Sequence, residues 1–391
     1  MGVSGQNARL NGPVALVVSP HAGRGRGPEA AASALRYAGV EIAEELPVSA
    51  LDHRWPRGAE WASRGIRTAV AAGGDGTIGA VASQIAGSGV ALGILPLGTS
   101  NDSARSLTIP LDLDDACSVI AHGIPTPIDA GQVLPALTEP GGLSPQHQGA
   151  AATPGQQAEQ ALLAAHGAYF LHALTLGLNV HFARLATDVA RRERWGPLTY
   201  AASALQALTE FEPAPIVLTL SGVAANEHNG QPLGSDDELV IMRRVIQVAV
   251  VNLPVFGGAI NLRLPGRAVQ RHLFDIVLIE ALETQALRTT LDGLLAQLDR
   301  LRENLFGGGA DREVTAETIA ASTAAIGTGL PGVHRYQART ARIETPQGVD
   351  VTLDGEIRAR TPVNIRVAQD MVQVLLPEDA HTRLQNESGA L

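Results

Sequence analysis

The sequence predicts an α/β domain followed by a mostly antiparallel β domain. Over residues 11–132, short apolar runs alternate with helical segments, and most of these runs end at glycines. This pattern is typical of a parallel sheet covered by helices. Over residues 133–376, strand-like segments joined by Gly, Asn or Pro turns predominate, as in antiparallel sheets. Residues 377–391 are a candidate for completing the first domain.

Three strands and three helices are predicted in the first domain. The strands are continuous apolar runs, as expected of strands buried on both faces. They are Pro13–Val18, Arg67–Ala72 and Val90–Leu95, and the helices are 28–38, Thr77–Ile85 and Asp112–His122. The ligand site of such a sheet lies at the carboxyl ends of its strands, so the residues that follow each strand are the candidates for chemistry.

The second domain is predicted from runs of apolar and β-branched residues. They are Tyr169–Leu178, Ile216–Ser221, Leu239–Asn252, Ala259–Leu264, Asp275–Glu280, Ala341–Glu344, Val349–Leu353 and Val363–Val367. Two helices, Leu198–Glu210 and Glu283–Phe306, interrupt the strands. Segments with little periodicity at 135–166, 224–237 and 307–332 are expected to be loop insertions.

Composition narrows the classes of function. All 29 basic residues are arginine, which excludes a P-loop lysine and a Schiff-base lysine. The net charge of −10 argues against a nucleic-acid partner. The single cysteine, Cys117, excludes internal disulfides. The polar N-terminus and the absence of an apolar run near 18 residues predict a cytoplasmic protein whose membrane contact, if it has one, is peripheral.

The first candidate site segment follows the first strand. In Ser19–Gly27, alternating glycines such as Gly23 would let backbone N–H groups approach a phosphate, and Arg24 and Arg26 can bind its oxygens. A surface loop rich in Gly and Arg would look the same.

The second segment follows the second strand. Gly73, Gly74 and Gly76 surround one carboxylate, Asp75, and Thr77 begins the next helix. Such a turn can hold a phosphate through N–H groups while the carboxylate faces Mg²⁺ or the reacting centre.

Two further segments carry polar groups at strand ends. In Pro96–Asp102, Gly98 shapes a turn in which Thr99 and Asn101 can bind phosphate or ribose, and Asp102 either contacts the ligand or caps the next helix. The turn Leu353–Glu356 places a glycine between two carboxylates. Because neighbouring parallel strands end at one sheet edge, we expect the turns after the second and third strands to converge.

The four segments together resemble the diacylglycerol kinase catalytic-domain family, which includes bacterial lipid kinases and sphingosine kinases. Gly73–Thr77 matches the family pattern G-G-D-G-T, Pro96–Arg105 matches P-x-G-T-x-N-D-x-A-R, and Asp354–Glu356 matches D-G-E. Three later segments, Tyr169–Gly177, Gly196–Tyr200 and Asn252–Gly258, resemble landmarks of the family's β domain. The resemblance covers about residues 13–376.

The resemblance implies a fold and an activity. The first domain would be like that of NAD kinases and phosphofructokinases, the second would be a β-sandwich, and the site would lie between them. The implied reaction is Mg-ATP-dependent phosphorylation of a lipid hydroxyl. By this resemblance, Asp75 and Glu356 would be the catalytic carboxylates. We favour Glu356 as the base that accepts the hydroxyl proton, with Asp75 near Mg²⁺, but the opposite assignment stays open.

Several positions depart from the family pattern. Ser19, Ala22 and Arg24 stand where Asn, Ser and Lys are usual. Gly79 and Ala80 replace an Asn-Glu pair. Ser100 and Ser103 replace Gly and Phe, and Asp275 alone remains of an acidic run linked to a structural Mg²⁺. We therefore doubt a metal at Asp275 and expect Arg271 to take the vacated charge position.

Two rival functions remain open: a non-catalytic regulator that binds nucleotide or lipid, and an NAD kinase. The cluster Arg191–Trp195 fits either a membrane-surface patch or a solvated helix end. An edge strand of the β domain could support a homodimer.

Overall fold

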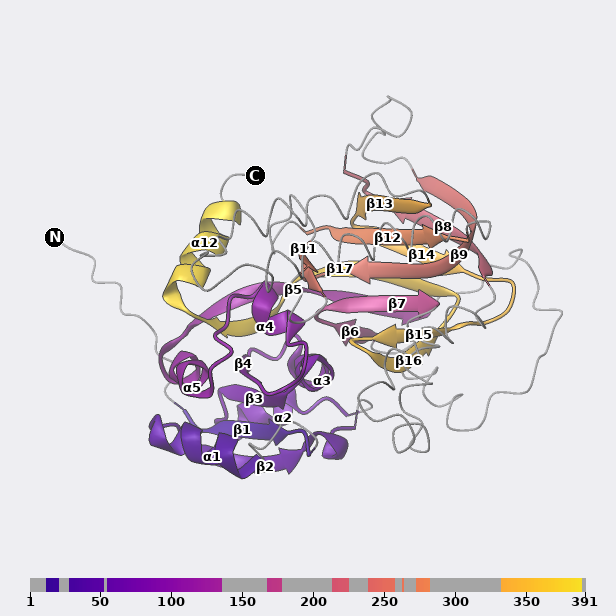
Figure 1. The fold of residues 1–391 in the computed structure, drawn as a ribbon. Helices are drawn as coiled ribbons and strands as arrows, with labels where there is room; N and C mark the ends of the chain where they lie inside the picture. Colours follow the sequence, from indigo (N-terminus) through magenta and orange to yellow (C-terminus); the bar gives the residue numbers. More distant parts are fainter. Residues whose placement is uncertain are drawn as a thin grey trace, which may run out of the picture.

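The computed structural model describes residues 12–20, 28–52, 55–135, 167–177, 213–224, 238–256, 262–263, 272–281 and 332–388. The predicted fold class, an α/β part followed by a strand-rich part, is confirmed (Figure 1). The predicted helices at 198–210 and 283–306 and the cluster Arg191–Trp195 lie outside the described residues. So does each predicted loop insertion apart from Pro135, Ala224 and Gly332.

The first half is a parallel sheet in the order β4-β3-β1-β2. Its strands are β1 (Val14–Val18), β2 (Ile42–Pro47), β3 (Thr68–Gly73) and β4 (Ala91–Pro96). Its helical segments are α1 (Pro28–Tyr37), η1 (Val48–Ala50), α2 (Gly58–Ser63), α3 (Asp75–Ile85), α4 (Asp102–Ser106) and α5 (Leu113–His122). The sequence analysis missed β2, because this edge strand alternates exposed residues with partly buried ones and lacks a continuous apolar run.

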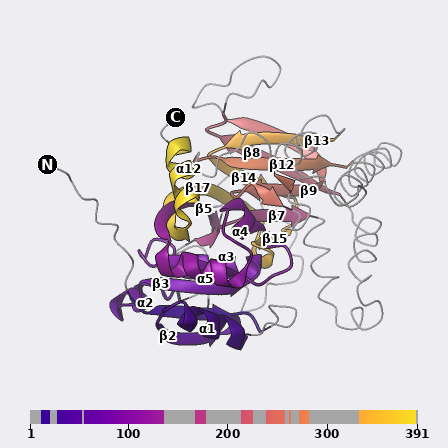
Figure 2. The same cartoon turned by 60° about the vertical axis from the view of Figure 1, so that its left-hand side comes forward.

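Helices cover both faces of this sheet (Figure 2). Leu16 of β1 packs with Leu35 of α1 and Ala116 of α5 on one face. Val17, the next residue, packs on the other face with Trp61 of α2 and Ile78 of α3. Consecutive strand residues thus enter two separate cores, which explains why the strand is apolar throughout.

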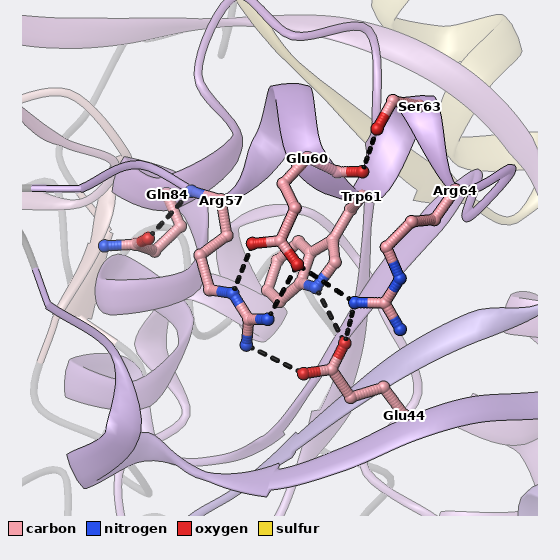
Figure 3. Close-up of polar contacts among 7 residues, drawn as sticks. All are labelled: Glu44, Arg57, Glu60, Trp61, Ser63, Arg64 and Gln84. Atoms are coloured by element: carbon pink, nitrogen blue, oxygen red, sulfur yellow. Dashed lines mark hydrogen bonds and ion pairs between the residues drawn. The ribbon is translucent and has the colours of Figure 1, made fainter.

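Helix α2 is fixed to the edge strand β2 by an ion-pair network (Figure 3). Glu44 accepts hydrogen bonds from Arg57 Nη1 at 2.8 Å, Arg64 Nη1 at 2.7 Å and the Trp61 ring nitrogen at 3.2 Å. Both arginines also pair with Glu60 at 3.0 Å.

Two long strands belong to both halves of the molecule. They are β5 (Ile124–Pro135) and β17 (Val363–Leu376), which pair antiparallel along most of their length. The end of β17 pairs in parallel with β4, and its beginning pairs antiparallel with β14 (Thr340–Glu344). A single 15-stranded sheet therefore joins the two halves in the described part of the chain. The prediction that this strand ends at Val367 is wrong, because pairing resumes at Val372 after an irregularity.

The remaining described strands form an antiparallel assembly (Figure 1). They are β6 (Ala168–Phe170), β7 (Ala173–Gly177), β8 (Ala214–Ser221), β9 (Leu239–Val251), β10 (Val255–Phe256), β11 (Leu262–Arg263), β12 (Phe274–Glu280), β13 (Val333–Ala338), β15 (Asp350–Leu353) and β16 (Glu356–Arg360). Leu174, Leu218, Val248 and Ile276 lie in their shared core. The last helix, α12 (Glu378–Ser388), returns to the first half, where Ala380 and Leu384 enter its core. Among the helices of the described residues, none is both long and apolar enough to cross a membrane.

Candidate active site

The turns after β3 and β4 lie against each other. Gly73 is the register partner of Pro96, and the Leu97 N–H donates to the Gly73 carbonyl at 2.9 Å. A Cβ atom on Gly98 would lie 2.4 Å from the Cα atom of Gly74. Glycine at position 98 is therefore required for the close approach of these two turns. The predicted convergence of both turns at one sheet edge is present in the structure.

Asp75 connects the two turns through its carboxylate. It is the first residue of α3, and its oxygens accept hydrogen bonds from the backbone N–H groups of Asp102 at 3.1 Å and Ser103 at 2.8 Å. These donors belong to the first turn of α4, whose N-cap residue, Asn101, makes no side-chain cap hydrogen bond. The side chain that caps α4 is therefore Asp75. The alternative that Asp102 caps this helix is wrong, because Asp102 lies within it.

Asn101 holds the second turn in shape. Its backbone is left-handed, with φ 53°, and its side chain is buried. The Asn101 amide donates to the carbonyls of Pro96 and Gly98 and accepts from the Gly98 N–H at 2.9 Å. Asn101 thus shapes the loop, and the neighbouring Thr99 is exposed at its tip.

Ser19 lies beside the first of these turns, because its N–H donates to the Ala72 carbonyl at 3.0 Å. Gly23, Arg24 and Arg26 fall outside the described residues. The first candidate segment therefore begins next to Gly73, and the placement of its glycines and arginines stays a prediction.

The third turn, Leu353–Glu356, is organised around Asp354. This buried residue has φ 50°, and its carboxylate accepts three backbone hydrogen bonds, from Leu171 at 2.8 Å, His172 at 2.8 Å and Ala173 at 3.0 Å. Burial raises the pKa of Asp354 above its usual range, and the three N–H donors oppose that shift. The sequence analysis assigned no role to Asp354, which anchors the turn that carries Glu356.

This third turn contacts the first turns of α3. The Asp354 carbonyl oxygen is 3.7 Å from where a Cβ atom of Gly76 would lie, and Asp354 Oδ2 is only 2.2 Å from a Cβ atom placed on Gly79. Glu356 follows directly and is exposed. The structure thus brings Asp354–Glu356 against the helix that begins with Asp75, although 279 positions separate Asp75 from Asp354.

Buried polar residues that the sequence analysis missed fix this junction. Asn252 donates to the carbonyls of Asp129 and Leu171, both at 2.7 Å. His172 Nε2 bonds to the Val255 carbonyl at 2.8 Å, which makes that nitrogen the donor. The Val255 N–H donates to the Ser106 hydroxyl of α4 at 3.0 Å. The family resemblance of Asn252–Gly258 was the available signal for this segment.

The surroundings of Asp275 do not fit a metal ion. Its buried carboxylate accepts from Arg335 Nη2 at 2.7 Å and Nε at 2.8 Å, and from Gln337 Nε2 at 3.1 Å. The positive charge beside Asp275 is thus that of Arg335, on the paired strand β13, whereas Arg271 lies outside the described residues. Among the described residues, no three His, Cys, Asp or Glu side chains gather as a metal site requires.

Comparison with known proteins agrees with this arrangement. A family model for the diacylglycerol kinase catalytic domain matches residues 13–133. Residues 13–133 are thus similar to the catalytic domain of diacylglycerol kinases. A diacylglycerol kinase from Mycobacterium tuberculosis is 25% identical over 372 residues, which cover 94% of this chain and 96% of that protein. The matched kinase segment contains β1 to β4 and both turns at their carboxyl ends.

Other relatives are more similar in sequence but over a shorter stretch. A probable lipid kinase YegS-like from Cronobacter sakazakii is 46% identical over 79 residues, which span 19% of this chain and 26% of that protein. A solved diacylglycerol kinase structure from Bacillus anthracis aligns with a TM-score of 0.51 at 17% identity. A second structure from that species aligns with a TM-score of 0.55 at 20% identity, over 94% of this chain and 98% of its own. These structures share the fold of this chain.

Proposed function

We propose that this protein transfers the γ-phosphate of ATP to the hydroxyl group of a lipid, with a diacylglycerol-like or sphingoid-like acceptor. The observation that carries the proposal is the meeting of three turns: Gly73–Thr77, Pro96–Asp102 and Leu353–Glu356. They bring Asp75 and the turn that carries Glu356, from opposite halves of the molecule, to one helix, α3. Phosphoryl transfer depends chiefly on such positioning and on neutralising phosphate charge.

Nucleotide binding is assigned to the closely apposed turns and to the loop after β1. Backbone N–H groups of the loop that follows Ser19 and of the turns that contain Gly74 and Gly98 would bind phosphate oxygens, although the Ser19 and Gly98 N–H groups themselves bond to Ala72 and Asn101. Arg24 and Arg26 would supply the positive charge that a lysine-free chain needs. Asn101 contributes by holding the loop that presents Gly98. Thr99 is exposed at the tip of the same loop and is free to face the nucleotide side of the turn.

Asp75 fits a nucleotide-bound Mg²⁺ better than Asp275 does. Its carboxylate is partly exposed, and each oxygen receives one backbone N–H, which leaves lone pairs for a further ligand. Mg²⁺ is commonly held by one or two carboxylates together with substrate phosphates. When bound, the ion would neutralise charge on the transferred phosphoryl group. The Asp102 and Ser103 N–H groups would keep the Asp75 carboxylate in a fixed orientation.

Glu356 is assigned as the general base. It is exposed, and it follows a turn that the buried Asp354 carboxylate fixes. Its backbone would therefore stay in place while its carboxylate contacts a lipid hydroxyl. A carboxylate in this role accepts the hydroxyl proton as the oxygen attacks phosphorus. The acceptor's apolar chain would lie along the strand-rich half.

Transfer of label from [γ-³²P]ATP tests the proposal against its rivals. With Mg²⁺ and a total lipid extract, we expect labelled lipid. When NAD replaces the lipid extract, we expect no labelled NADP. Label in NADP alone would identify an NAD kinase. A regulator, which the replacement of an Asn-Glu pair by Gly79 and Ala80 would favour, predicts a thermal shift with Mg-ATP and no labelled product.

A further inference from the structure

Arg358 is a buried arginine on β16 that the proposed reaction does not yet use. Only 8% of its surface is exposed, and its Nη2 donates to the Ser83 hydroxyl of α3 at 3.1 Å. Burying a guanidinium is costly unless hydrogen bonds compensate for the lost water. A buried arginine at this interface therefore fixes the two elements that it joins, β16 and α3.

A β-bulge directs this side chain. Thr352 of β15 pairs with Ile357, and the preceding residue, Val351, pairs with Ala359. Arg358 is thus the extra residue on β16. Bulges re-aim a side chain away from the regular alternation of a strand, and they are over-represented beside active sites. Here Arg358 is buried between two neighbours that are more exposed.

The α3 residues that face this segment lie on one stripe. Gly76 and Gly79 face Asp354, and Ser83 contacts Arg358. Positions 76, 79 and 83 follow helical spacing, so they share one face of α3. The chain from Asp354 to Arg358 therefore runs along this face. Its start is held by the backbone of Leu171–Ala173, and its end is held to α3 by the Arg358–Ser83 hydrogen bond. Glu356 is the central residue of that five-residue segment.

The geometry points to Arg358 as a positioning residue for Glu356, an inference that rests on the proposed function. In the described part of the sheet, β16 is a terminal strand whose ladder neighbour is β15. Its position relative to Asp75 therefore depends on contacts outside this ladder, among them the Arg358–Ser83 hydrogen bond to α3. Asp354 fixes the start of the segment, and Arg358 fixes its end. Loss of the second contact would let Glu356 shift, and small displacements of a reacting group cost large factors in rate.

Arg358→Met and Arg358→Lys test this inference, with Arg360→Met as the matched control. Arg360 is exposed on the same strand, and its Nη2 donates to the Gly348 carbonyl at 2.7 Å. We expect Arg358→Met to lower kcat for lipid phosphorylation at least tenfold, with the KM for Mg-ATP within twofold of wild type. Arg358→Lys, which keeps a donor for Ser83, should recover most of kcat, and Arg360→Met should stay within twofold.

Hydrogen exchange supplies a readout that does not depend on activity. Amides of residues 354–358 should exchange at least tenfold faster in Arg358→Met than in wild type, while those of β15 keep their rates. The inference would be overturned if Arg358→Met kept both the exchange rates and the kcat of wild type. It would also be overturned if Arg358→Lys had no higher kcat than Arg358→Met, or if the KM for Mg-ATP rose as kcat fell. If the wild-type protein labels no lipid, the proposed function fails, and the exchange result still decides whether Arg358 fixes this segment.

Discussion

The carboxylate of Asp354 occupies the space that a side chain at position 79 would need. A Cβ atom on Gly79 would lie 2.2 Å from Asp354 Oδ2, far inside van der Waals contact. The same carboxylate accepts three backbone N–H groups from the β6–β7 connection, so it is held from the other side. The absence of a side chain at Gly79 thus permits the two halves to meet as closely as they do.

A substitution at Gly79 should destabilise the protein much more than the same substitution at Gly76, one helical turn earlier. We expect Gly79→Ala to lower the free energy of unfolding by about 2 kcal/mol, the typical cost of overpacking, because Asp354 cannot move without losing its donors. Gly76→Ala is the control on the same helix, where an added Cβ meets the Asp354 carbonyl at an ordinary 3.7 Å. Urea unfolding measures both, and equal stabilities of the two variants would refute the contact.

The buried pair Asp275–Arg335 should behave as a structural ion pair. Arg335→Met leaves a fully buried carboxylate without its cation, so we expect the free energy of unfolding to fall by about 3–5 kcal/mol. Adding Asp275→Asn should restore part of that loss, because the uncompensated charge is removed. Arg342→Met, in a more exposed pair with Glu344, should cost at most about 1 kcal/mol. A double variant no more stable than Arg335→Met would contradict this role.

The network at α2 predicts a defined pH dependence of stability. Burial opposes ionisation of Glu44, but hydrogen bonds from Arg64 and Arg57 outweigh it and hold the pKa of Glu44 below its ordinary value. Its stabilising effect is therefore fully present above the unfolded-state pKa of about 4.3, and it is lost as the pH falls through the lower folded-state pKa.

Glu44→Gln should accordingly lower the free energy of unfolding by about 2 kcal/mol at pH 7. The difference from wild type should begin to shrink only below about pH 4.3. Glu45→Gln is the control, since Glu45 makes a looser contact of 4.0 Å with Arg36. Urea titrations from pH 7 to about pH 3 measure both variants. A difference from wild type that grows as the pH falls would contradict the lowered pKa of Glu44.

Cys117 should not react with thiol reagents in the folded protein. It lies on the buried face of α5 and is 1% exposed, and burial raises the pKa of its thiol to about 11, with smaller contributions from Asp114 and Asp112. A thiol reacts as its thiolate, so Ellman's reagent at pH 8 should label the native protein only at the rate of unfolding. Rapid stoichiometric labelling without denaturant would disprove this burial.

The first half of the fold was largely predictable, because β1, β3 and β4 are continuous apolar runs that end in glycine turns. The strands β2, β5, β13 and β16 were missed. Each carries several exposed or partly exposed residues, so none has the apolar signature that a buried strand has. The full length of β17 was hidden as well, because a break at Asp370, with φ 52°, interrupts its periodicity.

The glycines and carboxylates of the candidate site could be predicted from the sequence. The contacts that hold these residues in place could not. Local motifs indicated Asp75 and Glu356, but they could not indicate that Asp75 would cap α4, nor that Asp354 would bind the chain at Leu171–Ala173. These contacts join segments more than 25 positions apart, up to more than 180. The pairing of Asp275 with Arg335 was missed for the same reason, since the partner lies on another strand.

We propose that Glu356 and Asp75 act on one phosphoryl group. The most direct measurement is the initial rate of ³²P transfer from labelled ATP to lipid by Glu356→Gln, compared with wild type and Asp75→Asn. We expect transfer by Glu356→Gln to fall about 10²–10⁴-fold without a change in Tm, since Glu356 is exposed. Asp75→Asn should also stop transfer, with a modest fall in Tm because one α4 N–H loses its acceptor. Transfer by Glu356→Gln at near wild-type rate would contradict the account.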